Sequence, residues 1–181
     1  MRITYLRMLM VAVAACALPA RAQVTVTVNP AVQYQTVLGW GAASWSPPWV
    51  TQALREEIVS EAVNDLGLTR LRLEPPSGNR SNGRNWEWLN DNGDPYDINW
   101  SAFNTGLVDK RVLEMVIPFK QRVEANGEPF NMYVSPSFFN SGSSGAVPAW
   151  LRYSPGEYTE YASTILLYLR DTYGIEADYY C

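Results

Sequence analysis

The 181-residue sequence contains no histidine and only two cysteines, Cys16 and Cys181. Without histidine, the chain cannot build a Ser-His-Asp triad, a His-rich zinc site or an imidazole acid-base group. Because Cys16 lies in a predicted leader, an exported chain keeps no internal disulfide. No cluster has metal-ligand spacing, so we predict neither a metal nor a cofactor. Carboxylates are the remaining groups for acid-base chemistry.

Basic residues are also scarce. The sequence has 14 Lys and Arg against 18 Asp and Glu, a formal net charge of −4. Residues 1–22 carry three arginines and no acid, so the rest of the chain has 11 basic and 18 acidic residues and a net charge of −7. Since no basic cluster remains to neutralise phosphates, we expect no nucleic-acid partner. Neutral or cationic substrates fit better.

Residues 1–22 have the pattern of a secretory signal peptide. Two arginines precede an apolar run at residues 9–18, and Ala20-Arg21-Ala22 offers a small-residue cleavage site. The sequence thus indicates a secreted or periplasmic protein, although residues 13–16 also resemble a lipobox that would leave a lipid anchor on Cys16. The run is shorter than the roughly 20 residues that span a bilayer, so we expect no membrane span.

The segment after the signal is a single predicted strand. Val and Thr alternate strictly from Val24 to Val28, and Asn29-Pro30 ends the pattern. An isolated strand needs a partner, and none is obvious nearby. We therefore assign residues 23–34 to a strand of a side β-domain.

From residue 35 onward, strand and helix patterns alternate. Apolar stretches predict strands at 35–44, 69–74, 130–135 and 177–181, and helical spacing predicts helices at 51–66, 110–125 and 155–173. Thr51 and Ser154 are the expected N-caps, and Pro118 is expected to kink or break the second helix.

This alternation predicts a parallel sheet, either in a closed barrel or in an open doubly wound fold. No Gly-x-Gly-x-x-Gly or Walker motif follows the first strand, which weakens the nucleotide-binding open sheets. The fold class we predict is α/β, with residues 35–181 forming the first half of an incomplete (β/α)8 TIM barrel.

The candidate site lies beyond the carboxyl ends of the predicted strands. Arg72 stands on an otherwise apolar strand, and Glu74, two residues on, points to the same face. The two residues could form a structural ion pair, or they could position a substrate or a catalytic carboxylate. The segment 75–105, rich in Asn, Gly and Asp with interspersed tryptophans, is longer than ordinary connections, which indicates a function.

Several motifs together resemble glycoside hydrolase family 30. They are residues 35–44, Gly67-Leu68-Thr69-Arg70-Leu71-Arg72-Leu73, Ser135-Pro136 and Val147-Pro148-Ala149-Trp150-Leu151-Arg152. That family includes endo-xylanases, endo-β-1,6-galactanases, β-1,6-glucanases and glucosylceramidases. Its fold is a strand-helix barrel with a β-sandwich completed by both chain ends, which would account for the strand at residues 23–34.

The resemblance also implies the site residues. Arg72 matches an arginine that orients the site and Trp150 matches a tryptophan that lines the sugar cleft, while Trp40 and Ser137 are further substrate-binding candidates. In the family, an Asn-Glu-Pro triplet supplies the acid/base and a later Glu is the nucleophile. Neither is present in this sequence, so we assign no catalytic residue and expect the chain alone to be inactive, with both glutamates implied beyond Cys181.

The function implied is that of the N-terminal fragment of a secreted retaining glycoside hydrolase, monomeric at full length. Its substrate would be a β-linked polysaccharide or oligosaccharide of the xylan or β-1,6-galactan or glucan type, and no cofactor is needed. The alternative is a non-catalytic secreted carbohydrate-binding protein that uses its Trp-rich loops.

Overall fold

The structure is a computed structural model that describes residues 25–34, 39–45, 47–76, 86–136 and 147–181. The chain divides into two units, Met1–Thr36 and Val37–Cys181. In the first unit, residues 25–34 form no helix or strand. The described part of the strand predicted at 23–34 is therefore unpaired, because a strand exists only where a neighbour completes its hydrogen bonds. Its place in a side β-domain stays a prediction.

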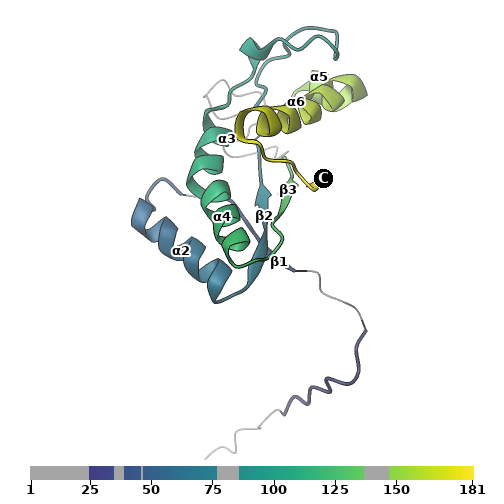
Figure 1. Cartoon of the computed structure of the whole chain (residues 1–181). Coiled ribbons are helices and arrows are strands. Elements are labelled where there is room, and N and C mark those ends of the chain that lie inside the picture. Colours follow the sequence, from purple (N-terminus) through teal and green to yellow (C-terminus); the bar gives the residue numbers. More distant parts are fainter. Residues whose placement is uncertain (1–24, 35–38, 46, 77–85, 137–146) are drawn as a thin grey trace, which may run out of the picture. The chain divides into compact units, whose positions relative to one another are not determined.

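Four parallel strands form the sheet of the second unit, in the order β1-β2-β3-β4 (Figure 1). They are β1 (Trp40–Ala43), β2 (Leu68–Leu73), β3 (Asn131–Val134) and β4 (Tyr179–Tyr180). Each strand pairs with the next one along the chain, as a strand-helix series predicts. Strands were predicted at all four places. Part of the first prediction, residues 35–38, lies outside the described residues.

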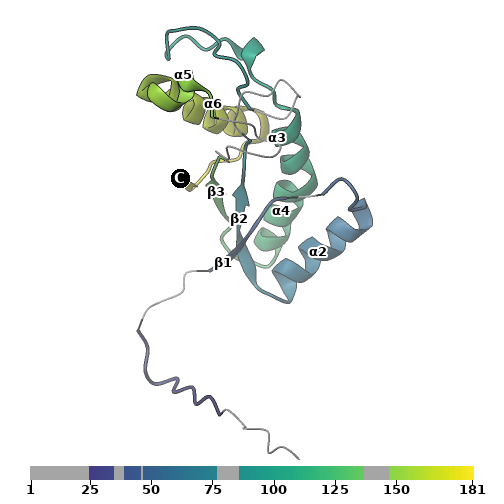
Figure 2. The same ribbon diagram turned by 180° about the vertical axis from the view of Figure 1, so that it is seen from behind.

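Helices connect the strands (Figures 1 and 2). They are α2 (Gln52–Asn64), α3 (Gly106–Arg111), α4 (Ile117–Ala125), α5 (Ala149–Tyr153) and α6 (Pro155–Tyr173). Among the described residues, no helix combines the length and the apolar character needed to cross a membrane.

Both predicted N-caps are present. The Thr51 hydroxyl accepts the backbone N–H of Leu54 at 3.3 Å, and the Ser154 hydroxyl accepts that of Glu157 at 3.4 Å. Each bond satisfies a donor that the first helical turn leaves without a partner. Helix α6 ends at Gly174, whose φ of 64° is the left-handed conformation of a glycine cap.

Pro118 does not end the second helix. A π-helical turn, Val112–Val116, joins α3 to α4 directly before it, so helical backbone runs from Gly106 to Ala125. Proline has no N–H to donate and its ring crowds the carbonyl of the preceding turn, and a wider turn relieves both conflicts. The expected kink or break is thus realised as a local widening of the helix.

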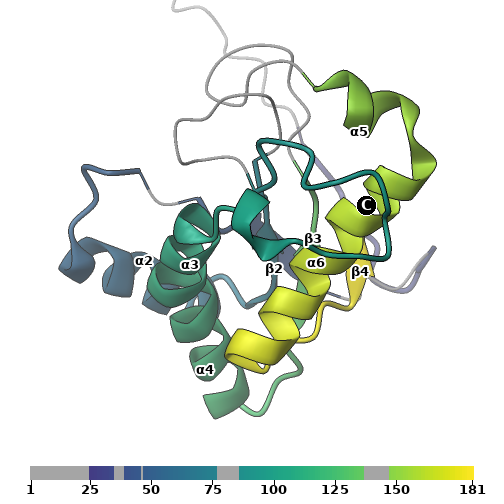
Figure 3. The same cartoon turned by 90° about the horizontal axis from the view of Figure 1, so that it is seen from above.

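The hydrophobic core lies on one face of the sheet. Along β2, Leu71 and Leu73 are buried and Arg72 between them is exposed, and along β3 Met132 and Val134 are buried on either side of half-buried Tyr133. The buried strand residues pack in one cluster with helix residues Val59, Val63, Val112, Val116, Phe119, Val123, Ile165 and Leu169. Viewed from above, the helices form an arc along this side of the strands (Figure 3). The structure is therefore a mixed α/β fold with the described helices on one face.

We expect Leu73→Ala to lower the free energy of unfolding by about 2–5 kcal/mol, because it leaves a cavity where a fully buried side chain packs on the helices. Leu113→Ala is the matched control, since Leu113 is 58% exposed and the same truncation there should change stability by less than about 0.5 kcal/mol. Urea denaturation followed by circular dichroism measures both, and equal midpoints would contradict the one-sided core.

Candidate functional site

Arg72 and Glu74 form an ion pair at the carboxyl end of β2. The Arg72 Nη2 atom lies 3.1 Å from Glu74 Oε1, and the two side chains are 46% and 19% exposed. Arg111 of α3 donates a hydrogen bond to the backbone carbonyl of Glu74. Burial lowers the pKa of Arg111, Glu74 opposes that change, and Arg72 lowers the pKa further. Glu74 thus contacts two guanidinium groups, and the ion pair, one of the two alternatives, is present. A positioning role for Arg72 stays a prediction.

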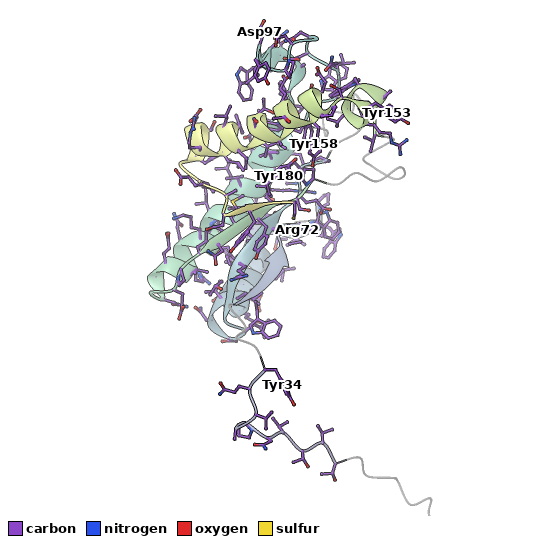
Figure 4. All side chains as sticks on the ribbon, turned by 90° about the vertical axis from the view of Figure 1, so that its right-hand side faces the viewer. Tyr34, Arg72, Asp97, Tyr153, Tyr158 and Tyr180 are labelled. Carbon is purple, nitrogen blue, oxygen red and sulfur yellow. The ribbon has the colours of Figure 1, made fainter. Side chains whose placement is uncertain are left out.

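A shallow hollow of about 520 Å³ lies on the open face of the sheet next to this pair. Its lining residues are Gly39, Gly41, Ala42, Ala43, Arg70, Leu71, Arg72 and Tyr133. The small residues of β1 leave the space, and the longer side chains of β2 and β3 edge it. The Arg70 guanidinium donates to the Tyr133 hydroxyl at 2.9 Å, and the Tyr133 ring stacks on Tyr179 with 4.6 Å between ring centroids. Figure 4 marks Arg72 on this part of the sheet.

Exposed tryptophans follow the carboxyl end of β1. The Ser44 N–H donates to the Arg72 carbonyl at 2.8 Å, which places the start of the β1–α2 connection beside β2. Trp45 and Trp49 in that connection are 61% and 75% exposed. Exposed aromatic rings beside a guanidinium and a carboxylate can bind a ring-shaped polar ligand, with the aromatic faces on its C–H groups and the charged groups on its hydroxyls.

The other predicted substrate-binding residues occupy different places. Trp40 begins β1 and lines a separate hollow with Gly67 and Leu68, at the amino ends of the strands and not at the carboxyl ends where the candidate site was predicted. The apolar run at residues 35–44 predicted a strand but did not indicate at which residue its hydrogen bonding to the next strand begins. Trp150 lies in α5, half-buried against the hydrophobic core. Ser137 lies outside the described residues. Substrate contacts by Trp40, Trp150 and Ser137 stay predictions.

A second group of polar side chains lies between the segment after β2 and helix α6. Glu87, Asp91 and Glu160 each place a carboxylate oxygen within 4.8 Å of the others. Glu87 is 1% exposed and Glu160 is 2% exposed, and Glu157, one turn earlier on α6, is also buried. We call Glu87, Asp91 and Glu160 the carboxylate cluster.

Trp86 fixes Glu87 against α6. The Trp86 ring is fully buried, and its indole N–H donates to the Thr164 hydroxyl at 3.1 Å. Its ring centroid lies 5.8 Å from Phe103 and 5.3 Å from Tyr168. Figure 3 shows the teal segment that contains Trp86 passing over α6. Because Glu87 follows Trp86 directly in the chain, the buried Trp86 ring also fixes the position of Glu87 beside Glu160.

The carboxylate cluster cannot carry three uncompensated charges. At an effective dielectric constant of about 20, two unit charges 4.8 Å apart repel by about 3.5 kcal/mol. Burial, reinforced by Glu160, Asp91 and Glu157, raises the pKa of Glu87 to about 9. Burial, followed by the charge of Asp91, raises the pKa of Glu160 to about 7. The cluster therefore takes up either protons or a cation at neutral pH.

Comparisons of the chain with protein-family models, with curated proteins and with solved structures found no match. The functional argument for this chain consequently stands on the residues and their geometry.

The sequence pointed to the segment 75–105 by its length but did not reveal the cluster. Asp91 follows Glu87 by four residues, whereas Glu160 comes from a helix much later in the chain. No spacing rule connects residues that far apart. The available signal was the pair of acidic residues one turn apart, Glu157 and Glu160, flanking the predicted apolar face of α6.

We expect Trp86→Ala to lower the free energy of unfolding by about 3–5 kcal/mol and to open the segment 86–105 to protease, because it removes the ring that holds the segment on α6. Trp49→Ala, at a position that is 75% exposed, is the control and should leave both unchanged. Urea denaturation and limited proteolysis with mass spectrometry test this. If protease cleaves the Trp86→Ala variant as slowly as it cleaves the wild type, other contacts hold the segment in place.

Proposed function

We propose that this chain is part of an exported retaining glycoside hydrolase of the family 30 type, and that it binds a β-linked polysaccharide at the carboxyl ends of its strands. The observation that carries the proposal is the ion pair of Arg72 and Glu74 at the carboxyl end of β2, beside the hollow. The exposed Trp45 and Trp49 lie in the connection that follows the carboxyl end of the neighbouring strand β1. Together these residues combine the charged and aromatic groups that recognise saccharides, at the edge where strand-helix barrels do their chemistry.

The arrangement of the helices supports a barrel as the parent fold. An open doubly wound sheet has helices on both faces, whereas a (β/α)8 barrel has them outside only. In the part of the chain that the structure describes, α2, α4 and α6 contribute to a core on one face. We therefore propose that residues 35–181 form the first half of a (β/α)8 barrel.

Retaining hydrolysis uses two carboxyl groups about 5–5.5 Å apart, one as the nucleophile and one that protonates the leaving oxygen and then activates water. Arg72 is suited to a positioning role in this chemistry. A guanidinium near a carboxylate stabilises its charged form, which is the form that a nucleophile needs. Glu74 and Arg111 would keep the Arg72 side chain directed over the hollow.

Saccharide binding without hydrolysis is the second candidate. The exposure of Trp45 and Trp49 favours it, because flat exposed rings are sufficient to bind sugars. The two candidates share the binding face and differ in the presence of a catalytic carboxyl pair. Hydrolysis by the complete gene product distinguishes them.

We expect Arg72→Ala to weaken the binding of β-linked xylan, β-1,6-galactan or β-1,6-glucan oligosaccharides by about 10-fold, as loss of a charge-assisted hydrogen bond predicts. Tryptophan fluorescence and affinity electrophoresis measure the affinity. Arg170→Ala removes the same side chain from the exposed surface of α6 and is the matched control. Equal affinities for the two variants would refute the proposed face, and binding of none of these saccharides would refute the proposed ligand class.

The complete gene product should hydrolyse the oligosaccharide that binds most tightly and should release a product with the anomeric configuration of the substrate. Proton NMR during the first turnovers reads the configuration before mutarotation. An inverted product would contradict the retaining mechanism. Binding without any release of reducing sugar would establish the second candidate.

A further inference from the structure

We propose that Glu87, Asp91 and Glu160 bind a hard divalent cation of the size of Ca²⁺, which ties the segment 86–105 to helix α6. The site is separate from the proposed saccharide face and does not depend on the proposed function. Its ligands come from two parts of the chain, the segment after β2 and the first half of α6.

The first argument is that buried acceptors in the cluster lack a hydrogen bond of normal geometry. Both carboxylate oxygens of Glu87 and both of Glu160 are inaccessible and have no hydrogen-bond partner of normal geometry among the described residues. Asp91 is the group that comes nearest to partnering them, since its backbone N–H lowers the pKa of Glu87 and its side chain raises that of Glu160. In Asp91, Oδ1 is likewise buried without a partner, whereas Oδ2 accepts the backbone N–H of Asn99 at 2.5 Å. Folded proteins pair nearly all buried carboxylates or use them to coordinate metals. Three carboxylates with buried, unpartnered oxygens, one oxygen of each lying within 4.8 Å of the others, therefore indicate a ligand.

The second argument is that, among the residues that the structure describes, no basic side chain forms an ion pair with the cluster. The ion pairs of the described residues involve Glu114, Glu74, Glu124 and Asp171, and none involves the cluster. The charges that act on Glu87 and Glu160 are those of other carboxylates, including nearby Glu157. A cation would offset the repulsion among them, and at this burial it would be shielded from water.

The third argument is size. One oxygen from each residue lies within 4.8 Å of the others, so an ion at their common centre would be at most about 2.8 Å from each. That distance is closer to the Ca²⁺–oxygen distance of about 2.3–2.6 Å than to the Mg²⁺–oxygen distance. The shorter bonds of Mg²⁺, about 2.0–2.1 Å, and its strict octahedral geometry fit less well. Carboxylate oxygens suit these hard ions better than zinc or copper.

The competing arrangement fills the cluster with protons. Glu87 and Glu160, whose pKa values are raised, would then be protonated. Such a cluster needs no cation, so its stability would be the same in chelator and in calcium. This difference makes the proposal testable.

The test uses the full chain stripped with EDTA and titrated with CaCl₂ by calorimetry. We expect one Ca²⁺ per chain, and affinity at least about 10-fold lower in Glu87→Gln and in Glu160→Gln, since ligand loss costs at least as much as loss of an outer-shell partner. Glu57→Gln, an exposed position on α2, makes the same charge change and should bind Ca²⁺ as the wild type does. MgCl₂ in place of CaCl₂ should bind at least about 10-fold more weakly.

Thermal unfolding shows whether the variants fold and adds a second readout. In EDTA, Glu87→Gln should unfold at the wild-type temperature or above it, because glutamine keeps the shape and needs neither a proton nor a cation to be neutral. In saturating CaCl₂ the order should reverse, because only the wild type gains stability from the ion. Terbium luminescence excited through Trp86, which adjoins Glu87, should appear in the wild type and be lost in Glu87→Gln.

Three results would overturn the proposal. The first is the absence of both calorimetric heat and a calcium-dependent unfolding temperature in the wild type. The second is unchanged binding in Glu87→Gln and Glu160→Gln. The third is a Glu87→Gln variant that is more stable than the wild type in EDTA and in CaCl₂ alike, which identifies the proton-filled cluster. Equal affinity for Mg²⁺ and Ca²⁺ would overturn the size assignment.

Discussion

The alternation of side chains along β2 and β3 is the constraint on which the rest of the structure depends. Leu71, Leu73 and Met132 point to one face, and Arg72 and Tyr133 point to the other. Helices can bury their apolar residues only against the first face, so the polar face stays open. The hollow beside Arg72 is a consequence of this pattern, because a one-residue shift of either strand would exchange the two faces.

The spacing of residues along helix α6 likewise determines which of its side chains are buried. Tyr161, Ile165 and Leu169 recur every four residues and pack into the core, while Glu160 and Thr164 lie on the adjacent stripe beneath the segment that carries Trp86. Because the core covers one stripe of α6 and the segment 86–105 covers the adjacent one, the helix buries residues that would otherwise be exposed to water. Buried carboxylates on α6 thus follow from the way the long segment is seated, and they require protons or an ion for the same reason.

Periodic features of the fold were predictable from the sequence, and tertiary ones were not. Strand and helix positions, the caps at Thr51 and Ser154 and the pairing of Arg72 with Glu74 follow from periods of 2 and 3.6 residues and from local capping chemistry. In the sequence, Trp86 lies in a polar segment that is typical of a loop, yet in the structure it is a core residue. Its partners Thr164 and Tyr168 are far away in the sequence and come together with it only in the folded chain. The carboxylate cluster was hidden for the same reason.

Helix α3 connects the two regions through hydrogen bonds to β2 and to α6. Arg111 at its end donates to the carbonyl of Glu74, and Asp109 accepts the hydroxyls of Tyr168 and Tyr173 of α6, each at 2.7 Å. Burial raises the pKa of Asp109, but the hydrogen bonds from Tyr173, Thr105 and Tyr168 outweigh it and hold that pKa below its usual value. Asp109 is thus ionised at neutral pH and anchors α6 without help from the carboxylate cluster. The state of the cluster therefore bears on how the segment 86–105 is held on α6, where Trp86 packs on Tyr168, while the position of Arg72 is set by β2 and by its ion pair with Glu74.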